Sequence, residues 1–286
     1  MWLADRAPVV IISADSRQVY RGFDIGTAKP TAAERARAPH RGVDVVDPAR
    51  RYSAAAWAES ADQWIADTIA EGRTPLIVGG TGLYLRALFD GLFEEPALEP
   101  ARRAALESEL ATWSLRDLAR WAAALDPARA HLGRTQLLRA IEIALLTGQR
   151  LSELHSVAAR ESRWRPRYLV VDPGTVLGDR IAARTDAMFD AAWPDEVRRL
   201  MHTVPADAPA WKSTGYDVVR QYVTGVVPRS AAREAVVIAT RQYAKRQRTW
   251  FRHQLDADRV TRLDPSDAGW RDVAARWWSA AAEATA

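Results

Sequence analysis

Two short apolar segments with a helical pattern between them constrain the fold of this chain more than any other feature. The first, Pro8 to Ser13, reads PVVIIS, and such a continuous β-branched segment is typical of a strand buried on both faces of a parallel sheet. The second, Pro75 to Val78, runs directly into the turn GGTG at 79–82. Between them, Ser53 to Glu71 has apolar residues at helical spacing. This order of strand, helix, strand and glycine-rich turn predicts a doubly wound parallel α/β sheet.

Polar residues follow both predicted strands at their carboxyl ends. Asp15-Ser16 comes after the first strand, and Gly79 to Thr81 comes after the second. Ligands of doubly wound sheets sit beyond the carboxyl ends of the strands, so we expect these residues to face one crevice. A third apolar segment, Tyr168 to Val171, ends in Asp172-Pro173-Gly174 and predicts another strand.

The middle of the chain changes to a helical pattern without strand signals. Helices are expected over Arg102–Leu118 and Arg134–Leu146, with a break at Asp126-Pro127. We therefore predict an inserted helical domain over residues 99–160 and an α/β core made of residues 1–98 and 161–286. The alanine-rich C-terminus is interpreted as a solvated helix end. Further helices are expected at Arg180–Phe189, Asp195–Met201, Thr214–Thr224 and Ser230–Leu255.

Composition excludes several classes of protein. The 286 residues include no cysteine, which removes disulfides, thiolate catalysis and Cys-ligated zinc. No segment approaches the roughly 18 apolar residues of a membrane span, and the N-terminus does not form a signal peptide, so we expect a cytoplasmic protein with no membrane partner. The net charge of +4 is too small to indicate nucleic-acid binding by itself. The 12 tryptophans are interpreted mostly as core residues.

The N-terminal segment resembles the interior of a doubly wound domain rather than its start. Met1–Arg6 resembles the last turn of a helix, and the phosphate-loop pattern G-x-x-x-x-G-K-[ST] occurs nowhere in the sequence. We predict from this that the usual first strand and phosphate loop of a doubly wound domain are missing.

The polar segments at the strand ends each have two interpretations. Asp15 can be a general base or a metal ligand, or it can only cap the next helix. Gly79-Gly80-Thr81 can offer backbone N–H groups and a hydroxyl to a phosphate, although many strand–helix turns carry glycine without a ligand. The loop Asp24–Pro30 holds the isolated Lys29 and equally fits a plain turn.

Two groups of basic residues are equally open. Arg180 and Arg184 lie four residues apart on one predicted helix face, where they can bind an anion or pair with neighbouring aspartates. Residues 241–253 combine five Lys and Arg side chains with three aromatic ones. This fits an RNA-binding face, or a charged amphipathic helix that docks through Trp250 and Phe251.

Five segments taken together resemble one family, the tRNA dimethylallyltransferases, also called tRNA isopentenyltransferases. The patterns DSxQxY, DIGTAKP, GGTxLY and RQxAKRQxTWFR are specific, and they occur in the family's order across nearly the whole chain. The resemblance implies a P-loop-NTPase-like, nucleotide-binding (ATP-binding) fold whose inserted helical domain grips the anticodon stem-loop. The matching segments are IISADSRQVYRGFDIGTAKP (11–30), VGGTGLYLRAL (78–88), RIAARTDAMF (180–189), STGYDVV (213–219) and ATRQYAKRQRTWFR (239–252).

The resemblance also implies a reaction: transfer of a dimethylallyl group from dimethylallyl diphosphate to N6 of the adenosine immediately 3′ of the anticodon in tRNA. Asp15 would match the general base that accepts the N6 proton. Thr81 and Arg184 would match catalytic residues at the diphosphate end, where Mg²⁺ would help although no protein metal ligand is assigned. The target base would be flipped into a channel to meet the donor, and we expect the enzyme to be a monomer.

The tRNA contacts of the family carry over residue by residue. In the inserted domain the family often reads QRLxR where this chain reads TQLLR, so Gln136 replaces an arginine. The implied contacts are Asp15, Ser16, Arg17, Gln18, Thr81 and Arg103, then Thr135, Gln136, Leu137, Leu138 and Arg139, then Lys212, Ser213, Thr214, Gly215, Tyr216 and Asp217, and finally Lys245, Arg246, Gln247, Arg248, Thr249, Trp250, Phe251 and Arg252.

The absent phosphate-loop pattern is the main departure from the family. Either the start codon has been assigned too far downstream, which we favour because the other motifs are intact, or the product is truncated. The departure also predicts little or no prenyl transfer by this polypeptide. Two other classes stay open: an adenylate isopentenyltransferase acting on a free nucleotide, and a non-catalytic tRNA-binding protein.

Overall fold

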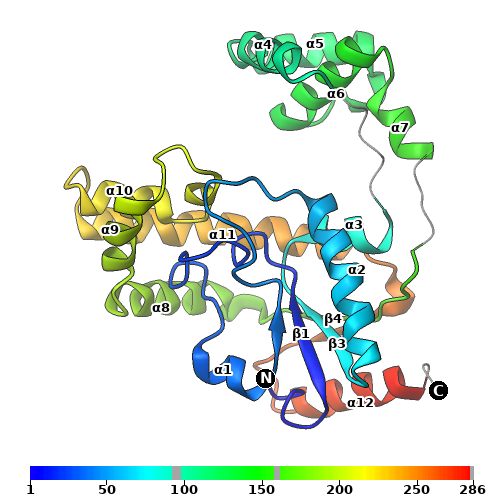
Figure 1. Ribbon diagram of the computed structural model, residues 1–286, viewed down its shortest axis with the longest axis vertical. Coiled ribbons are helices and arrows are strands. Elements are labelled where there is room, and N and C mark those ends of the chain that lie inside the picture. Colours follow the sequence, from blue (N-terminus) through cyan, green and yellow to red (C-terminus); the bar gives the residue numbers. More distant parts are fainter. Residues whose placement is uncertain (92–97, 158–161, 284–286) are drawn as a thin grey trace. The chain divides into compact units, whose positions relative to one another are not determined.

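A computed structural model describes residues 1–91, 98–157 and 162–283 (Figure 1). The chain forms two compact units, an α/β unit of Met1–Leu88 with Trp164–Ala286 and a helical unit of Phe89–Arg163. The sequence predicted a helical domain over residues 99–160, so its first boundary falls ten residues after the observed start at Phe89. The second predicted boundary, between residues 160 and 161, lies outside the described residues.

Parallel strands form the centre of the α/β unit. One sheet has the strand order β2-β1-β3, and a second sheet pairs β4 with β5. The predicted parallel α/β architecture is confirmed, although its strands fall into two sheets and the sequence did not indicate β2 or β5. The strands are β1 (Val9–Ser13), β2 (His40–Arg41), β3 (Thr74–Val78), β4 (Tyr168–Val171) and β5 (Val260–Leu263).

β1 is the central strand of its sheet and is buried along its whole length, with α2 and the cluster that includes Trp278 packed against it. Ile11 pairs with His40 of β2 and with Leu76 of β3. The prediction that a first strand is missing is not supported, since the described sheet is built around a strand that begins at Val9. The preceding Met1–Arg6 form hydrogen-bonded turns rather than the expected helix end.

Helices cover the strands of the α/β unit. The helix predicted between the two apolar segments is α2, which follows β2 and leads into β3. The hydroxyl of Ser53 caps it by accepting a bond from the N–H of Ala56. Its buried face, which includes Trp57, Ala61 and Ile65, follows the helical period. The helices of this unit are α1 (Ala32–Arg37), α2 (Ala54–Ala70), α3 (Gly82–Phe89), α8 (Leu177–Asp190), α9 (Trp193–Thr203), α10 (Tyr216–Val223), α11 (Arg229–His253) and α12 (Trp270–Glu283).

The C-terminal helix packs against the unit through residues 274–278, whereas the side chains of residues 281–286, in the alanine-rich segment interpreted as a solvated helix end, lie outside the description. Ala274 and Trp277 of α12 are buried, and α12 contacts β5. Trp278 packs against the cluster around β1, while Trp2 lies edge-on to Trp270 with 5.6 Å between the ring centroids. These contacts place several of the tryptophans in the core, as predicted.

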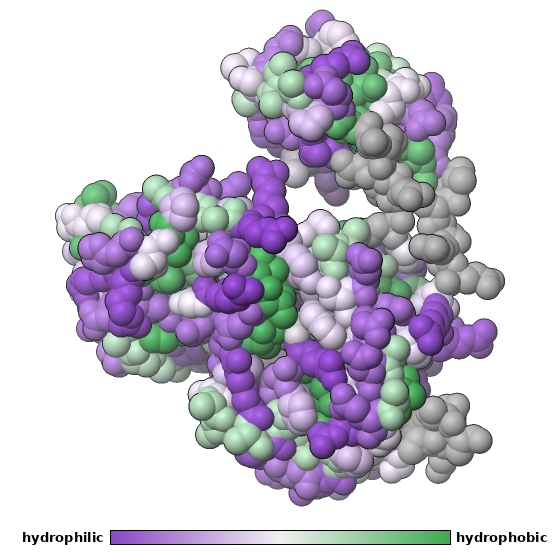
Figure 2. Space-filling view, in the orientation of Figure 1, coloured by the Kyte–Doolittle hydropathy of each residue, from purple (hydrophilic) through white to green (hydrophobic). Residues whose placement is uncertain are grey.

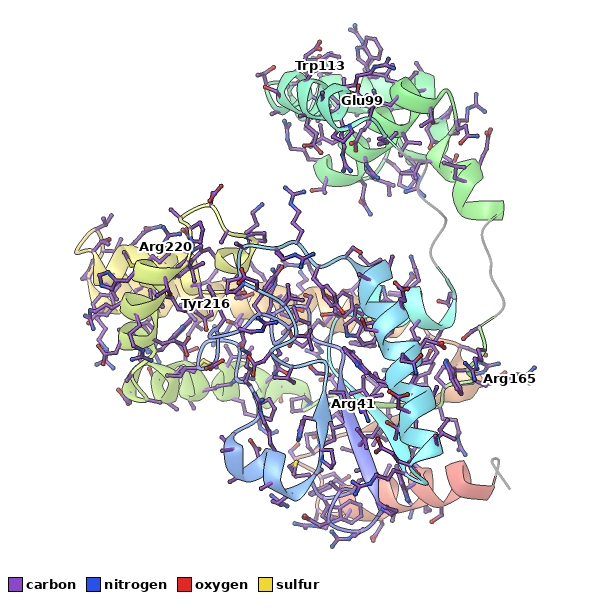
Figure 3. All side chains as sticks on the ribbon, viewed as in Figure 1. Arg41, Glu99, Trp113, Arg165, Tyr216 and Arg220 are labelled. Carbon is purple, nitrogen blue, oxygen red and sulfur yellow. The ribbon has the colours of Figure 1, made fainter. Side chains whose placement is uncertain are left out.

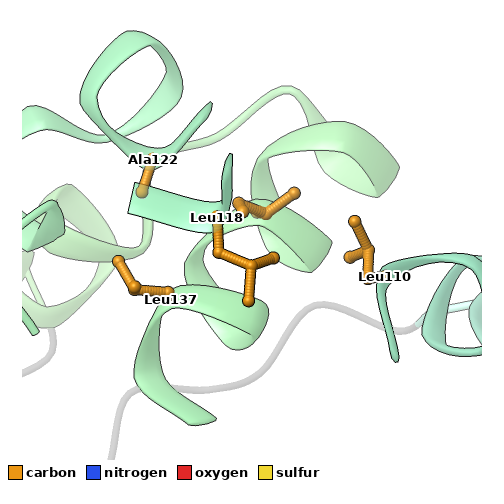
Figure 4. Close-up of a cluster of buried hydrophobic side chains, with 5 residues drawn as sticks. Leu110, Leu118, Ala122 and Leu137 are labelled. Carbon is orange, nitrogen blue, oxygen red and sulfur yellow. The ribbon is translucent and has the colours of Figure 1, made fainter. Parts of the chain in front are cut away.

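The helical unit has a core of its own (Figure 4). The expected single helix over Arg102–Leu118 is wrong, because the hydroxyl of Ser114 accepts a bond from the N–H of Asp117 and starts a new helix there. The expected break at Asp126-Pro127 is confirmed. The helices are α4 (Pro100–Ala111), α5 (Leu115–Leu125), α6 (Arg134–Thr147) and α7 (Leu151–Val157), and the core cluster consists of Leu110, Leu118, Ala122, Leu137 and Ile141.

The surface mixes hydrophilic and hydrophobic residues on the face shown in Figure 2. Among the described helices none combines the length and the apolar character that crossing a membrane requires. Three exposed apolar side chains, Val78, Leu83 and Val171, lie at the carboxyl ends of β3 and β4. This is the end of a parallel sheet where ligand sites form.

Candidate functional site

The carboxyl ends of β1 and β3 are joined by hydrogen bonds, so the polar residues that follow the two strands lie together as expected. Oγ1 of Thr81 accepts a bond from the backbone N–H of Ser16 at 3.0 Å and donates to Oγ of Ser16 at 3.3 Å. The N–H of Thr81 bonds to the carbonyl oxygen of Ala14. Asp15, which lies between Ala14 and Ser16, is therefore held beside the glycine-rich turn.

The carboxylate of Asp15 is held by backbone N–H groups and does not cap a helix. Its Oδ1 accepts bonds from the backbone N–H groups of Arg17 at 2.8 Å and Gln18 at 3.4 Å, which closes a turn rather than capping a helix. Burial raises the pKa of the Asp15 carboxyl, and the two N–H groups and the charges of Arg17 and Arg184 oppose this rise. A carboxylate at a strand end with a raised pKa is suited to accept a proton.

Arg184 of α8 acts on the charge of Asp15 from the neighbouring helix. Of the three aspartates that were its alternative partners, two pair with arginines of α11: Asp186 with Arg233 and Asp190 with Arg229. The third, Asp179, is exposed on α8 itself. Among the described residues Arg184 forms no hydrogen bond or ion pair. Its exposed guanidinium is therefore available to an anion, as one of the two interpretations requires.

The glycine-rich turn is shaped by close contact with α11. A Cβ atom at Gly80 would overlap the side-chain amide of Gln247, and one at Gly82 would overlap the indole ring of Trp250. The N–H of Thr81 is already used by Ala14, so the turn does not offer that group to a phosphate. What Thr81 can offer an anion is its hydroxyl.

α11 has two different faces within the segment that was predicted to bind RNA. Tyr243, Gln247 and Trp250 are half-buried and lie on one helix face, and Nε2 of Gln247 donates to the carbonyl oxygen of Gly80 at 3.0 Å. The helix therefore docks through Trp250, as one interpretation predicts. It keeps cations on its other face, which the RNA-binding interpretation needs. The exposed residues there are Lys245, Arg246, Arg248, Thr249 and Arg252.

Three of the expected tRNA contacts on this helix are less exposed than the cations beside them. Gln247 and Trp250 face the glycine-rich turn, and Phe251, which lies edge-on to Trp250, is half-buried. Arg248 is exposed but pairs through Nε with Asp172 at the end of β4, 2.9 Å away.

The loop Asp24–Pro30 is a rigid structural element. Nζ of the buried Lys29 bonds to the carbonyl oxygen of Tyr20 and to the carboxylates of Asp24 and Asp44. A buried ammonium needs such partners, so the turn interpretation holds for this lysine. The role of Asp44 was missed because nothing near it in the sequence marks it as a partner of Lys29.

Glu196 of α9 was also missed, and it ties this loop to α10. The carboxylate accepts bonds from the N–H groups of Asp24 at 3.1 Å and Ile25 at 2.7 Å, and from the hydroxyl of Tyr216 at 2.6 Å. Burial raises the pKa of Glu196, and these three bonds oppose the rise.

The segment Lys212–Asp217 is divided between the surface and the core. Tyr216 lies among α9, α10 and α11, where its ring packs against Phe23 and Trp193 (Figure 3). Ser213 is buried as well, whereas Lys212 and Asp217 are exposed and Thr214 and Gly215 are half-buried. Direct tRNA contact by the Tyr216 side chain is therefore corrected, because the residue has no accessible surface, and Ser213 keeps only 3% of its surface exposed.

The predicted tRNA contacts of the helical unit differ in exposure, from fully exposed to fully buried. Arg103 and Arg139 both pair with the buried carboxylate of Glu142. Thr135 and Gln136 are exposed, and Oε1 of Gln136 accepts a bond from the N–H of Gly133 at the start of α6. Leu138 is half-buried against the core cluster, and Leu137 is fully buried within it, so contact of Leu137 with tRNA is corrected.

No group of three or more His, Cys, Asp or Glu side chains that could hold a metal ion occurs in the described parts of the chain. The polar groups at the junction of β1 and β3 are one carboxylate, two hydroxyls and arginines. Such a set can accept a proton and stabilise an anion, but a divalent ion would need further ligands from its substrate or from water.

The fold and this site define a parallel α/β protein with a carboxylate, hydroxyls and an arginine at the carboxyl ends of its strands. A protein-family model, IPP transferase, matches residues 18–254. The chain belongs to this family, the tRNA dimethylallyltransferases.

Individual proteins support this assignment. A tRNA dimethylallyltransferase of Chromohalobacter salexigens is 41% identical over 270 residues, which cover 90% of this chain and 86% of that protein. The crystal structure of the full-length tRNA isopentenylpyrophosphate transferase of Bacillus halodurans is 32% identical with a TM-score of 0.68, and the match covers 98% of this chain and 90% of that one. A eukaryotic dimethylallyltransferase acting on tRNA shares the fold with a TM-score of 0.78 at 24% identity, over 96% of this chain and 72% of that chain.

Proposed function

We propose that this chain transfers a dimethylallyl group from dimethylallyl diphosphate to N6 of the adenosine immediately 3′ of the anticodon in tRNA. The observation that carries the proposal is the junction of Ser16 and Thr81 beside Asp15, in a chain of this family. In the reaction the C1–O bond to the diphosphate breaks and the N6–C1 bond forms. The proton released from N6 goes to a base on the protein.

Asp15 is the proposed base. Adenine N6 is a weak nucleophile, so removal of its proton as the new bond forms lowers the barrier. The raised pKa of the Asp15 carboxyl makes it a better proton acceptor than an ordinary exposed aspartate.

Thr81 and Arg184 are the proposed partners of the leaving diphosphate. The guanidinium of Arg184 is available to an anion, and a charge-assisted hydrogen bond from it would stabilise the charge that develops on the diphosphate. The hydroxyl of Thr81 donates to Ser16 over a long 3.3 Å, so its hydrogen can turn toward a phosphate oxygen at small cost. The exposed Val78 and Leu83 offer apolar surface for the dimethylallyl chain.

The Mg²⁺ ion implied by the resemblance would take most of its ligands from the diphosphate and from water. This is the usual arrangement for Mg²⁺ bound together with a phosphate substrate.

The exposed cations of α11 and the helical unit are the proposed tRNA-binding surfaces. Lys245 and Arg252 would contact phosphates, and helical residues 99–160 would hold the anticodon stem-loop. We infer that the enzyme acts as a monomer and, because its substrate is tRNA, that it works in the cytoplasm.

A transfer assay tests the proposal. The chain is incubated with dimethylallyl diphosphate, Mg²⁺ and an anticodon stem-loop, and the RNA is examined by mass spectrometry for one added dimethylallyl group. The matched control is a stem-loop with guanosine in place of the target adenosine, which should stay unmodified. Modification of AMP in preference to the stem-loop would favour the adenylate isopentenyltransferase, and stem-loop binding without transfer would favour the non-catalytic protein.

A further inference from the structure

The half-buried face of α11 lies directly on the turn that carries Thr81. Gln247 and Trp250 occupy the space next to Gly80 and Gly82, the two residues that flank Thr81. A helix side chain that bonds to the backbone of such a turn fixes the turn in the way that second-layer residues fix groups in active sites. Gln247 makes this bond, from Nε2 to the carbonyl oxygen of Gly80 at 3.0 Å.

We propose that Gln247 is a positioning residue for the transfer reaction, and that it acts on the Gly80–Gly82 turn rather than on tRNA. The inference deepens the proposed function and rests on it. Through Gly80 the amide of Gln247 sets the place of Thr81, and through the bond from Ser16 to Thr81 it sets the end of β1 that carries Asp15.

The surroundings of Gln247 agree with an inward role. Its side chain is half-buried, whereas Lys245, Arg246 and Arg248 on either side of it are exposed. The hydroxyl of Tyr243, one helical turn earlier, interacts with the side chains of both Thr81 and Gln247. The amide is thus held between the turn and α11, with its hydrogen directed to the backbone.

A pair of identical substitutions on one helix tests the proposal. Gln247→Glu removes the N–H donor and brings a carboxylate oxygen against the carbonyl oxygen of Gly80. Gln242→Glu makes the same change of charge at an exposed position of α11. Gln247→Met keeps the length of the side chain without a donor and serves as the second variant if the glutamate disturbs folding.

Steady-state kinetics separate positioning from RNA contact. We expect Gln247→Glu and Gln247→Met to lower kcat by about tenfold or more while KM for the stem-loop stays within about twofold, because misplacing a reacting group costs rate rather than binding. Gln242→Glu should match the wild type in kcat. A rise in KM for the stem-loop with unchanged kcat in the Gln247 variants would overturn the proposal.

Hydrogen exchange gives a readout that needs no enzyme activity. In the free protein the N–H of Thr81 is bonded to Ala14, and we expect its exchange to become about tenfold faster in both Gln247 variants and unchanged in Gln242→Glu. Unchanged exchange at Thr81 would contradict the positioning role. Faster exchange in a chain whose wild type transfers nothing would support the positioning of the turn and refute the proposed function.

Discussion

The hydroxyl of Thr81 accepts a hydrogen bond from the backbone N–H of Ser16, with 3.0 Å between Oγ1 and N. The bond links the carboxyl ends of β1 and β3 and keeps Asp15 beside the glycine-rich turn. It is the contact that turns two separate sequence motifs into one site, so most of our predictions concern its neighbours.

Two substitutions of Thr81 should distinguish the contribution of its hydroxyl from that of its side-chain volume. Thr81→Val keeps the volume but leaves the N–H of Ser16 without its partner, which we expect to cost about 1–3 kcal/mol of stability and to lower kcat by about 10²-fold. Thr81→Ser keeps the hydroxyl and should retain most of the activity. Equal losses in the two variants, measured by denaturation and by transfer kinetics, would contradict a role for the hydroxyl.

Asp15→Asn should lower the activity and raise the stability of the folded protein at neutral pH. The amide keeps the acceptor oxygen for the N–H groups of Arg17 and Gln18 but cannot take a proton, so we expect kcat to fall by about 10²–10⁴-fold. Because the pKa of Asp15 is raised in the folded protein, the folded state binds the proton more readily than the unfolded state does.

The stability gain of Asp15→Asn should therefore depend on pH. The folded wild type loses stability as pH rises through the raised pKa, so the variant should be the more stable protein at neutral pH and should lose this advantage below about pH 3.9, the ordinary pKa of aspartate. Urea unfolding at both pH values checks the sign. A variant that is less stable at neutral pH would contradict the cited burial effect. The activity of the wild type should also disappear as pH falls through the raised pKa of Asp15, because the protonated carboxyl cannot accept the N6 proton.

The strands and helices that carry the site could be predicted from the sequence because their signals are local. β1 is a continuous apolar segment, α2 has a helical period with a serine cap, and the strand-end rule then joined Asp15 to Thr81. β2 and α1 are too short to show a period. The break between α4 and α5 was missed because the apolar spacing continues across it, although α4 ends at Ala111 and the hydroxyl of Ser114 caps the start of α5.

Partners that are distant in sequence could not be predicted. Glu196 bonds to the N–H of Asp24 across 172 positions, and no local pattern marks a buried carboxylate of this kind. For the same reason the sequence could not divide α11 into a docked and an exposed face. Gln247 and Lys245 look alike as polar residues, but only the three-dimensional contact with Gly80 separates them.

Adding a methyl group to the glycine-rich turn should loosen α11. In Gly82→Ala the new Cβ meets the rigid indole of Trp250, and we expect a loss of about 1–3 kcal/mol in unfolding free energy. Gly80→Ala should cost less, because it meets the movable amide of Gln247. Gly178→Ala in α8 is the matched control: its Cβ would lie 3.4 Å from the nearest atom, so stability should stay or rise slightly. The reverse order of Gly80→Ala and Gly82→Ala would contradict this packing.

The exposed cations of α11 should account for the salt dependence of tRNA binding. Lys245 and Arg252 are exposed on the outer face, so the double variant Lys245→Ala/Arg252→Ala should lower the magnitude of the slope of log K against log [salt] by about 1.4–1.8, because each phosphate contact contributes about 0.7–0.9. The control is Arg229→Ala/Arg233→Ala on the same helix, where both guanidinium groups already pair with Asp190 and Asp186. Removing them subtracts the same charge but no free cation, so the slope should change less. If both double variants lower the slope equally, the effect is one of net charge and α11 has no specific RNA-binding face.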